Sequence, residues 1–266
     1  MQWTDEAIVL SVKPHGETAA VIELWTRTHG RHLGLVHGGR SRRLRPILQP
    51  GNHVDATWKA RLSDQLGHVT IEMRRAFAAE TLDDAAALAA LSTLTTLTHL
   101  LPERDPHPNL YEITLFVLGF LNDATVWPAL LVRWELALLE ELGFGLDLSQ
   151  CAATGSNDQL IYVSPRTGRA VSASAGEPYR DKLLPLPAFL TKHRSGHVTD
   201  DDIRLGFALT GHFLETRVLL PRGQSLPQPT PPLSRPSGGF QAGWPRPSVH
   251  GNPWVYLRER TPTPPV

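Results

Sequence analysis

The feature that most constrains the fold is a change in the spacing of apolar residues near residue 80. Before it, short segments rich in Val, Ile, Leu and Trp alternate with turn signals such as Pro14-His15-Gly16 and Pro50-Gly51, which is typical of β-strands. The pattern predicts five strands, at residues 7–13, 19–26, 32–37, 52–60 and 66–74. Five short strands in about 75 residues predict a closed or nearly closed Greek-key barrel of the OB kind, although an SH3-like barrel would give a similar pattern.

Beyond residue 80 the apolar period lengthens from two to about 3.6 residues, which predicts helices. Leucine and alanine recur at this spacing from Leu82 to Leu101, after an acidic pair, Asp83-Asp84, that suits the positive end of a helix dipole. Further helices are expected at 109–122 and at 128–142, the second ended by Gly143. We therefore predict an α+β, two-domain chain, with an OB-fold β-barrel at residues 1–80 and an all-α domain at residues 81–221.

Charge is divided between these two regions. Residues 27–61 hold eight basic residues and one acidic residue, Asp55, in a chain whose formal net charge is zero. Residues 81–150 hold ten acidic residues and two arginines. The first region attracts a phosphodiester backbone, because each phosphate that a cation neutralises releases counterions. The second region repels it, because both are negatively charged. We therefore expect a nucleic-acid surface on the barrel and not on the helices.

Four of the arginines stand in one predicted loop, between Gly38 and Pro46. A loop of cations on a β scaffold suits phosphate binding, although a basic run alone is equally well explained as a solvated loop. Exposed aromatic rings would add base stacking. Trp58 is a better candidate than Trp25, because it lies beside Lys59. An aromatic residue in so small a barrel is, however, more often in the core. The predicted nucleic-acid-binding residues are Arg27, Arg31, Arg40, Arg42, Arg43, Arg45, Trp58, Lys59 and Arg61.

The last part of the chain has a different composition. Residues 222–266 hold 11 prolines among 45 residues and no apolar periodicity, so we expect a Pro-rich disordered tail. Its apolar residues, Trp244 and the segment from Trp254 to Leu257, are candidates for docking on the body or on a partner. No apolar run approaches the roughly 20 residues that span a bilayer, and the N-terminus lacks the order of a signal peptide, so a cytoplasmic protein is expected.

Several short motifs follow one another along the chain. The first part contains Glu6-Ala7-Ile8-Val9-Leu10, Gly16-Glu17, Leu24-Trp25-Thr26, Gly30, Val36, Gly38-Gly39-Arg40 and Leu48-Gln49-Pro50-Gly51. The second part contains Leu142-Gly143-Phe144, Leu146-Asp147-Leu148, Cys151, Tyr162-Val163-Ser164-Pro165 and Gly168-Arg169. In this order they resemble the RecO family of recombination mediators, over roughly residues 1–222. The resemblance implies an N-terminal OB domain and a helical domain with a small zinc-ribbon-like β insert, here at about residues 146–180.

The resemblance also implies an activity and partners. Members of the family bind single- and double-stranded DNA and anneal complementary strands coated by single-strand-binding protein. They work with the RecR protein to load RecA recombinase, and they recognise the acidic C-terminal tail of single-strand-binding protein. What this implies for the chain is a role in DNA repair and recombination, in the cytoplasm and associated with the nucleoid.

The expected insert departs from part of the family in its metal ligands. Some members place two Cys-x-x-Cys pairs around the insert, which suits a tetrahedral zinc ion. Here Cys151 is followed by Thr154, and the second pair would fall near Ser172 and Ala175. We therefore predict a hairpin at residues 160–164 and 169–172 that lacks zinc ligands, no cofactor, and a Cys151 that is a small buried residue. As the single cysteine of the chain it forms no internal disulfide.

No set of residues indicates catalysis. His193 and His197 have the spacing of half a zinc finger but lack a matching thiolate pair, and Asp200-Asp201-Asp202 is explained by N-capping of the helical pattern that follows. The chain has neither a Gly-x-Ser-x-Gly elbow nor a Gly-x-x-x-x-Gly-Lys loop, and a nuclease would need clustered carboxylates on a strand. Two functions remain: a non-enzymatic DNA-binding mediator, and an interaction scaffold whose basic loop binds an acidic protein tail.

Overall fold

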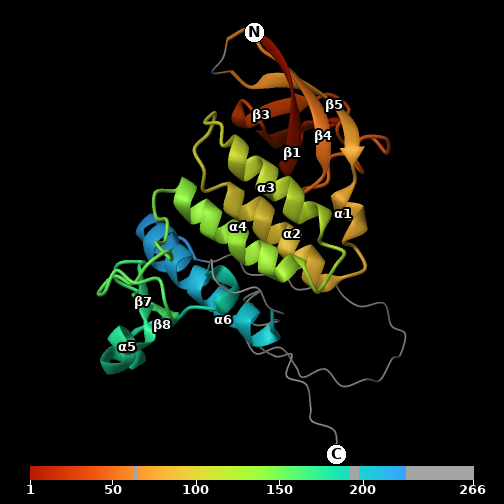
Figure 1. Cartoon of the computed structure of the whole chain (residues 1–266). Coiled ribbons are helices and arrows are strands. Elements are labelled where there is room, and N and C mark those ends of the chain that lie inside the picture. Colours follow the sequence, from red (N-terminus) through yellow and green to blue (C-terminus); the bar gives the residue numbers. More distant parts are fainter. Residues whose placement is uncertain (63–64, 192–197, 226–266) are drawn as a thin grey trace, which may run out of the picture.

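The computed structural model describes residues 1–62, 65–191 and 198–225. A β-barrel built from the N-terminal part of the chain lies against one side of a group of helices, and a small β sheet lies at the far side of that group (Figure 1). Within the described residues no helix is long and apolar enough to cross a membrane. Residues 226–266 of the predicted tail and the pair His193 and His197 fall outside the described residues.

All five predicted strands are present, and they form one closed barrel in the order β1-β2-β3-β5-β4. Neighbouring strands pair antiparallel, except β3 and β5, which are parallel over a short register at Gly34 and Leu35. The strands are β1 (Gln2–His15), β2 (Ala19–Thr26), β3 (Gly30–Val36), β4 (His53–Lys59) and β5 (Gly67–Arg75). Strand β1 starts earlier than the apolar pattern predicts, because its polar first residues pair with β4 from Gln2↔Lys59 onward.

Strand β1 explains how the barrel and the helices are joined. Successive side chains on a strand point to opposite faces, so Ala7 and Val9 enter the barrel core while Ile8 and Leu10 belong to the core of the helical part. Trp25 of β2 also faces outward, and its ring lies edge-on to the ring of Tyr111 at 5.3 Å between centroids. The uninterrupted apolar run from Ala7 to Leu10, in the middle of β1, therefore reflects burial on both faces.

The helical part contains α1 (Phe77–Glu80), α2 (Ala85–Thr98), α3 (Pro108–Gly119), α4 (Trp127–Glu141) and α6 (Asp200–Phe213). Helix α2 begins later than predicted, because the carboxylate of Asp84 accepts from the backbone of Ala86 and Ala87 and so caps the helix. Helix α4 ends before Gly143, as predicted; the φ of Gly143 is +83°, a left-handed conformation that glycine adopts readily.

Helix α6 begins with the predicted cap. The side chain of Thr199 accepts from the backbone of Asp202, and the Asp202 carboxylate accepts from the Thr199 backbone, which completes a capping box. The helix continues into a π-helical turn, η3 (Leu214–Leu219), and a short 3₁₀ turn, η4 (Leu220–Arg222). The N-capping interpretation of the acidic run is therefore confirmed.

Two hydrogen bonds between buried side chains order the helical core. Trp134 of α4 donates its indole N–H to Thr114 of α3 at 2.6 Å, and Thr210 of α6 donates its hydroxyl to Glu135 of α4 at 2.6 Å. Complete burial raises the pKa of Glu135 well above its ordinary value, although the Thr210 hydrogen bond opposes this shift. Glu135 is therefore a core residue whose protonated form is favoured by burial, and it is not part of the acidic surface of the helices.

The β insert is a hairpin extended by a third strand, in the order β7-β6-β8. Strands β6 (Leu160–Val163) and β7 (Ala170–Ser172) pair antiparallel, as predicted, and β8 (Leu184–Pro185) pairs with the other edge of β6. Between β7 and β8 the chain forms α5 (Ala173–Gly176) and η1 (Glu177–Lys182), and η2 (Ala188–Leu190) then returns it to the helices. Val163 and Ala170 are fully buried and join the helical core, so packing holds the hairpin in place.

Candidate nucleic-acid interface

The loop between β3 and β4 is held to the barrel by its own apolar residues. Leu48 is buried in the barrel core, and Leu44 and Ile47 pack against that core. The backbone N–H groups of Arg45 and Leu48 donate to the carbonyls four residues earlier, which forms helical turns without a full helix. The predicted loop is thus present, and its apolar residues fix the positions from which its basic residues point outward.

Arg40 fastens this loop to the turn between β1 and β2. Its Nη1 donates to the carbonyl oxygens of Gly16 and Glu17, at 3.0 and 2.9 Å, and its backbone N–H donates to Thr18. The side chain remains exposed, so its charge still contributes to the surface. Arg40 therefore acts first as an anchor of the loop.

Three arginines of the loop, Arg42, Arg43 and Arg45, point into solvent. Within the described part of the chain their guanidinium groups have no hydrogen-bond or ion-pair partner. A free guanidinium presents five N–H donors that match phosphate oxygens, and no carboxylate has to be displaced before it binds. The loop that carries these three unpaired side chains is called the basic loop below.

The remaining basic residues lie at the opposite end of the barrel. Strand β4 runs between the basic loop and Lys59, so its seven residues separate the two sites by about 20 Å. Lys59 and Arg61 are exposed there, and Arg27 in the β2–β3 turn pairs with Glu112 of α3 at 2.8 Å. The basic run of the sequence is thus divided into two surfaces by the fold.

The structure places Arg31, one of the predicted nucleic-acid contacts, in the interior of the molecule. Its side chain is 7% exposed and lies between the barrel and the end of α2. Nη2 is 3.1 Å from a Glu23 oxygen and 3.7 Å from a Glu103 oxygen, and Nη1 donates to the carbonyl of His99. All of these partners are internal, so Arg31 joins the barrel to the helical part instead of facing a ligand.

His99 completes this buried group. Its Nε2 lies 3.1 Å from the second carboxylate oxygen of Glu23, and that hydrogen bond raises the pKa of His99 above its ordinary value. Burial favours the neutral form of Glu23, but the hydrogen bond from His99 and the charges of His99 and Arg31 outweigh it and lower the pKa of Glu23. The four residues Glu23, Arg31, His99 and Glu103 are called the ionic clamp below.

The structure also places Trp58, the ring preferred for base stacking, inside the barrel. Trp58 is 2% exposed in the barrel core, and its indole N–H donates to the carbonyl of Leu33 at 3.2 Å. Gly67 lies directly against the ring, where any side chain would collide with it. Trp25 is fully buried between barrel and helices. Both rings therefore stabilise the core, and neither is open to a base.

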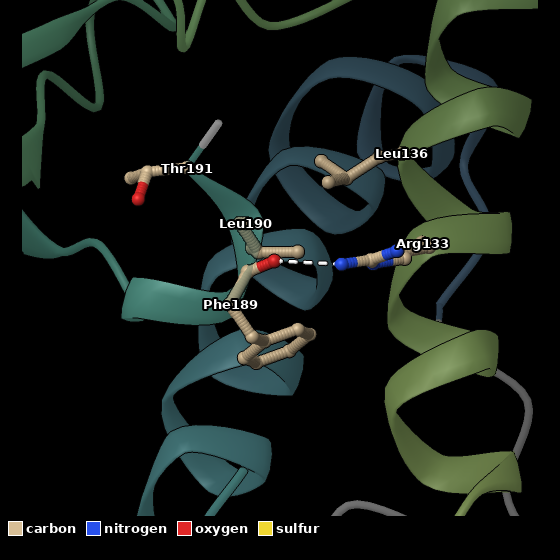
Figure 2. A pocket seen from close by; sticks show the side chains of 5 residues that line it. All are labelled: Arg133, Leu136, Phe189, Leu190 and Thr191. Atoms are coloured by element: carbon tan, nitrogen blue, oxygen red, sulfur yellow. Dashed lines mark hydrogen bonds between the residues drawn. The ribbon is translucent and has the colours of Figure 1, made fainter. Parts of the chain in front are cut away.

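A pocket of about 260 Å³ opens on the helical part, beside α4. It is lined by Arg133, Leu136, Phe189, Leu190 and Thr191. Figure 2 shows the Arg133 guanidinium directed across the pocket toward η2, where Nη2 donates to the carbonyl of Phe189 at 2.9 Å. Within the described residues no carboxylate pairs with Arg133. The pocket therefore combines apolar walls with one unneutralised cation.

The residues around Cys151 do not suit a zinc ion. Cys151 is buried, and its sulfur accepts a hydrogen bond from the backbone of Ser172 at 3.2 Å. Burial opposes ionisation, but hydrogen bonds from Ser172 and Thr154 lower the pKa of the thiol to about 6. The sulfur thus faces N–H and O–H donors, not a second thiolate or an imidazole. Among the residues that the structure describes, no three His, Cys, Asp or Glu side chains are grouped as metal ligands.

The fold and its surface define a protein in which a closed β-barrel carries a free basic loop and is joined by the ionic clamp to a helical part with a β insert. Models of known families give the particular relationship. Residues 1–77 match the model "Recombination protein O N terminal", and residues 82–226 match "Recombination protein O C terminal". The chain belongs to the recombination protein O (RecO) family, a family of DNA repair proteins.

Similar proteins support the same relationship. The chain is 56% identical over 233 residues to a protein of Methylorubrum extorquens (strain PA1) named DNA repair protein RecO, a match that covers 86% of this chain and 95% of that protein. Proteins of the same name from Rhodospirillum centenum (56% over 230 residues) and Rhodopseudomonas palustris strain CGA009 (55% over 228 residues) each match 85% of this chain and 91% of their own length. The resemblance inferred from the motifs is therefore confirmed.

Proposed function

We propose that this protein is a non-enzymatic recombination mediator of DNA repair that binds the DNA backbone through the basic loop. The observation that carries the proposal is the set of three unpaired, exposed guanidinium groups at Arg42, Arg43 and Arg45 on a loop fixed to a barrel. Phosphate contacts of this kind need no particular base, so they suit both single- and double-stranded DNA.

The barrel supports this proposal through its topology. A five-stranded barrel of order β1-β2-β3-β5-β4 has the strand number of an OB fold, a fold that binds oligonucleotides, and we propose that it is one. We also propose that the β insert is a zinc-ribbon-like element whose metal is replaced by packing and by the hydrogen bonds to Cys151. The domain limits proposed from the sequence, 1–80 and 81–221, remain predictions.

Membership of the RecO family supports the choice of partners. We propose that the protein anneals complementary strands, acts with RecR, and assists RecA loading on DNA coated by single-strand-binding protein, in the cytoplasm and at the nucleoid. The Arg133 pocket is the proposed position for the acidic tail of single-strand-binding protein. A tail carboxylate would meet the guanidinium there, and an apolar side chain would lie on Leu136 and Leu190.

The test of DNA binding uses the triple variant Arg42→Ala, Arg43→Ala, Arg45→Ala, with Arg40 kept because it anchors the loop. Fluorescence anisotropy of a labelled single strand is measured across a salt series. Loss of three phosphate contacts should weaken binding and reduce the slope of log K against log salt by about 0.7 per contact, or about 2 in all.

The matched control removes the same charge elsewhere. Arg166, Arg180 and Lys182 are exposed residues of the insert, and their triple alanine variant should keep the native slope. Equal slopes for the native protein and the loop variant would overturn the assignment of DNA to the basic loop. Absence of binding by the native protein would remove the mediator proposal itself.

The scaffold function remains the second candidate, because free arginines also bind carboxylates. A labelled acidic tail peptide distinguishes the two. If the peptide occupies the Arg133 pocket, Arg133→Ala should weaken peptide binding. Neither the basic-loop substitutions nor excess DNA should then change the affinity for the peptide. Competition between peptide and DNA, together with loss of peptide binding in the basic-loop variant, would favour the scaffold.

A further inference from the structure

Three aromatic rings form a column at the end of the barrel opposite the basic loop. The rings of Trp3 and Trp58, which are paired across β1 and β4, lie within 9° of parallel with centroids 5.6 Å apart. His29 of the β2–β3 turn stacks on Trp3 at 4.4 Å and within 12°. A fourth ring, His32, is edge-on to all three, at interplanar angles of 77°, 82° and 72°. We call these four residues the ring column.

The column runs from the barrel core to the surface. Trp58 is 2% exposed and Trp3 is partly buried, whereas the side chain of His29 is 34% exposed. His29 is therefore the outermost ring of the stack, with its partner Trp3 on one face and a large part of its surface open to solvent. A planar group can be added to such a stack only at this end.

The plane of His29 is fixed by hydrogen bonds. Nδ1 lies 3.0 Å from Oδ2 of Asp5, and because a carboxylate only accepts, Nδ1 carries the proton. The same oxygen accepts from the backbone and the hydroxyl of Thr28, at 2.8 and 2.7 Å. These bonds lower the pKa of Asp5 against the opposing effect of burial. A ring held in this way loses little freedom when it binds a second planar group.

The charges near the column indicate what that group is. Lys59 is adjacent to Trp58 and opposite Gln2, and Arg61 follows on the same rim; both are exposed and have no partner among the described side chains. The loop between α2 and α3 brings Glu103, Arg104 and Asp105 to the neighbouring β2–β3 turn, where two carboxylates outnumber one guanidinium and make the turn less favourable to a phosphate than the rim at Lys59. The ring thus suits a neutral planar base, and the phosphates of the same strand suit the side of Lys59 and Arg61.

We propose that the exposed face of His29 is a stacking position for one base of a single-stranded nucleic acid, with Lys59 and Arg61 as its phosphate contacts. The proposal rests on the proposed DNA binding and adds a second contact, about one strand length from the basic loop. It makes binding depend on unpaired bases, which the basic loop alone does not require.

A purely structural explanation is that the four rings only close the end of the barrel. Two substitutions separate it from the proposal, because both fill the space of the imidazole. His29→Phe keeps an aromatic face, whereas His29→Leu provides apolar volume without one. If the ring only closes the barrel, the two variants bind nucleic acid alike. If it stacks a base, only the phenylalanine variant keeps the native affinity.

The experiment compares a fluorescein-labelled oligothymidylate with an oligomer of equal length whose residues are abasic, at elevated salt. Stacking on an aromatic side chain is worth about 1 to 3 kcal/mol per base, so His29→Leu should weaken thymidylate binding by at least about fivefold. Its binding to the abasic oligomer should be unchanged. His15→Ala, which removes an exposed imidazole from the end of β1, should behave like the native protein with both oligomers.

Each other outcome contradicts the proposal. Equal affinity of His29→Leu and His29→Phe for thymidylate, or equal weakening with both oligomers, would overturn stacking while leaving DNA binding by the basic loop intact. No binding of either oligomer by the native protein would overturn the proposed function and the stacking site together. Unfolding midpoints of the two variants are measured alongside, and His29→Met, which is also apolar and has no ring, takes the place of the leucine variant if that variant loses its fold.

Discussion

At the end of the barrel where β3 leads into β4, arginines stand free in solvent; at the end where β2 leads into β3, Arg31 is buried among carboxylates. The two ends share residue types and even local patterns, since each has a left-handed glycine shortly before its arginines, Gly30 and Gly38. The two ends differ in the part of the chain that packs against them. The loop between α2 and α3 covers the second end, and within the described residues no helix covers the basic loop (Figure 1). Accessibility to a ligand is thus decided by tertiary contact and not by local charge.

The largest difference should appear when one arginine is removed from each end. Arg31→Ala leaves the carboxylate of Glu23 in a buried position with half its partners gone, and we expect a loss of about 3 to 5 kcal/mol in the free energy of unfolding. Arg43→Ala removes no contact within the described residues and should change that free energy by less than about 0.5 kcal/mol. Urea unfolding measures both. Similar stabilities for the two variants would show that the ionic clamp contributes no more than a surface charge.

A smaller difference should separate the two glycines. Gly30 has a φ of +68° and its hydrogen faces the backbone of Asp105, where a methyl group would collide with atoms that cannot move aside. Gly38 has a φ of +65° with open space around it, so Gly38→Ala should cost only about 1 to 2 kcal/mol of left-handed strain. Gly30→Ala should therefore lower the thermal midpoint clearly more than Gly38→Ala. Equal midpoints would mean that the contact with Asp105 is loose.

The smallest effect concerns pH. Because Glu23 raises the pKa of His99 in the folded state, the stabilisation is complete below the ordinary histidine pKa near 6.5 and is lost as pH rises through the folded value. The difference in unfolding free energy between the native protein and His99→Gln should therefore shrink as pH rises from about 6 toward the alkaline side of that window. Glu23→Gln should remove the same dependence. A difference that stays constant with pH would contradict the pairing of His99 with Glu23.

Much of the fold follows from the sequence because turn residues and apolar periods are local signals. Strand β2 lies where it was predicted, and helix α6 begins at the predicted cap. The early start of β1 was missed, since Gln2 to Asp5 carry no apolar alternation and become a strand only by pairing with β4. The period correctly indicated five strands, and their closure into one barrel depends on contacts between residues far apart in the chain.

The candidate site was harder to predict. The charge run identified Arg42, Arg43 and Arg45, but it gave Arg31 the same weight, because burial by the α2–α3 loop leaves no mark near residue 31. Among the aromatic residues, the sequence favoured Trp58 for base stacking because a basic residue follows it. The outermost ring of the column is instead a histidine, His29. The column joins residues 3, 29 and 58, so a sequence search would need the barrel register to find it. The weak signal available was the alternation of β4, which puts Trp58 on the inner face of that strand; the segment around Trp3 carries no such pattern.

Strand β1, with one face in each core, limits how this protein can be divided or recombined. A fragment that ended near residue 80 would expose Ile8, Leu10 and Trp25 to water, and Glu23 would lose its partner His99. Such a fragment would carry an apolar patch of the kind that drives self-association. The barrel is therefore not a portable module, and changes on its outer face have to be matched by changes in α2 and α3.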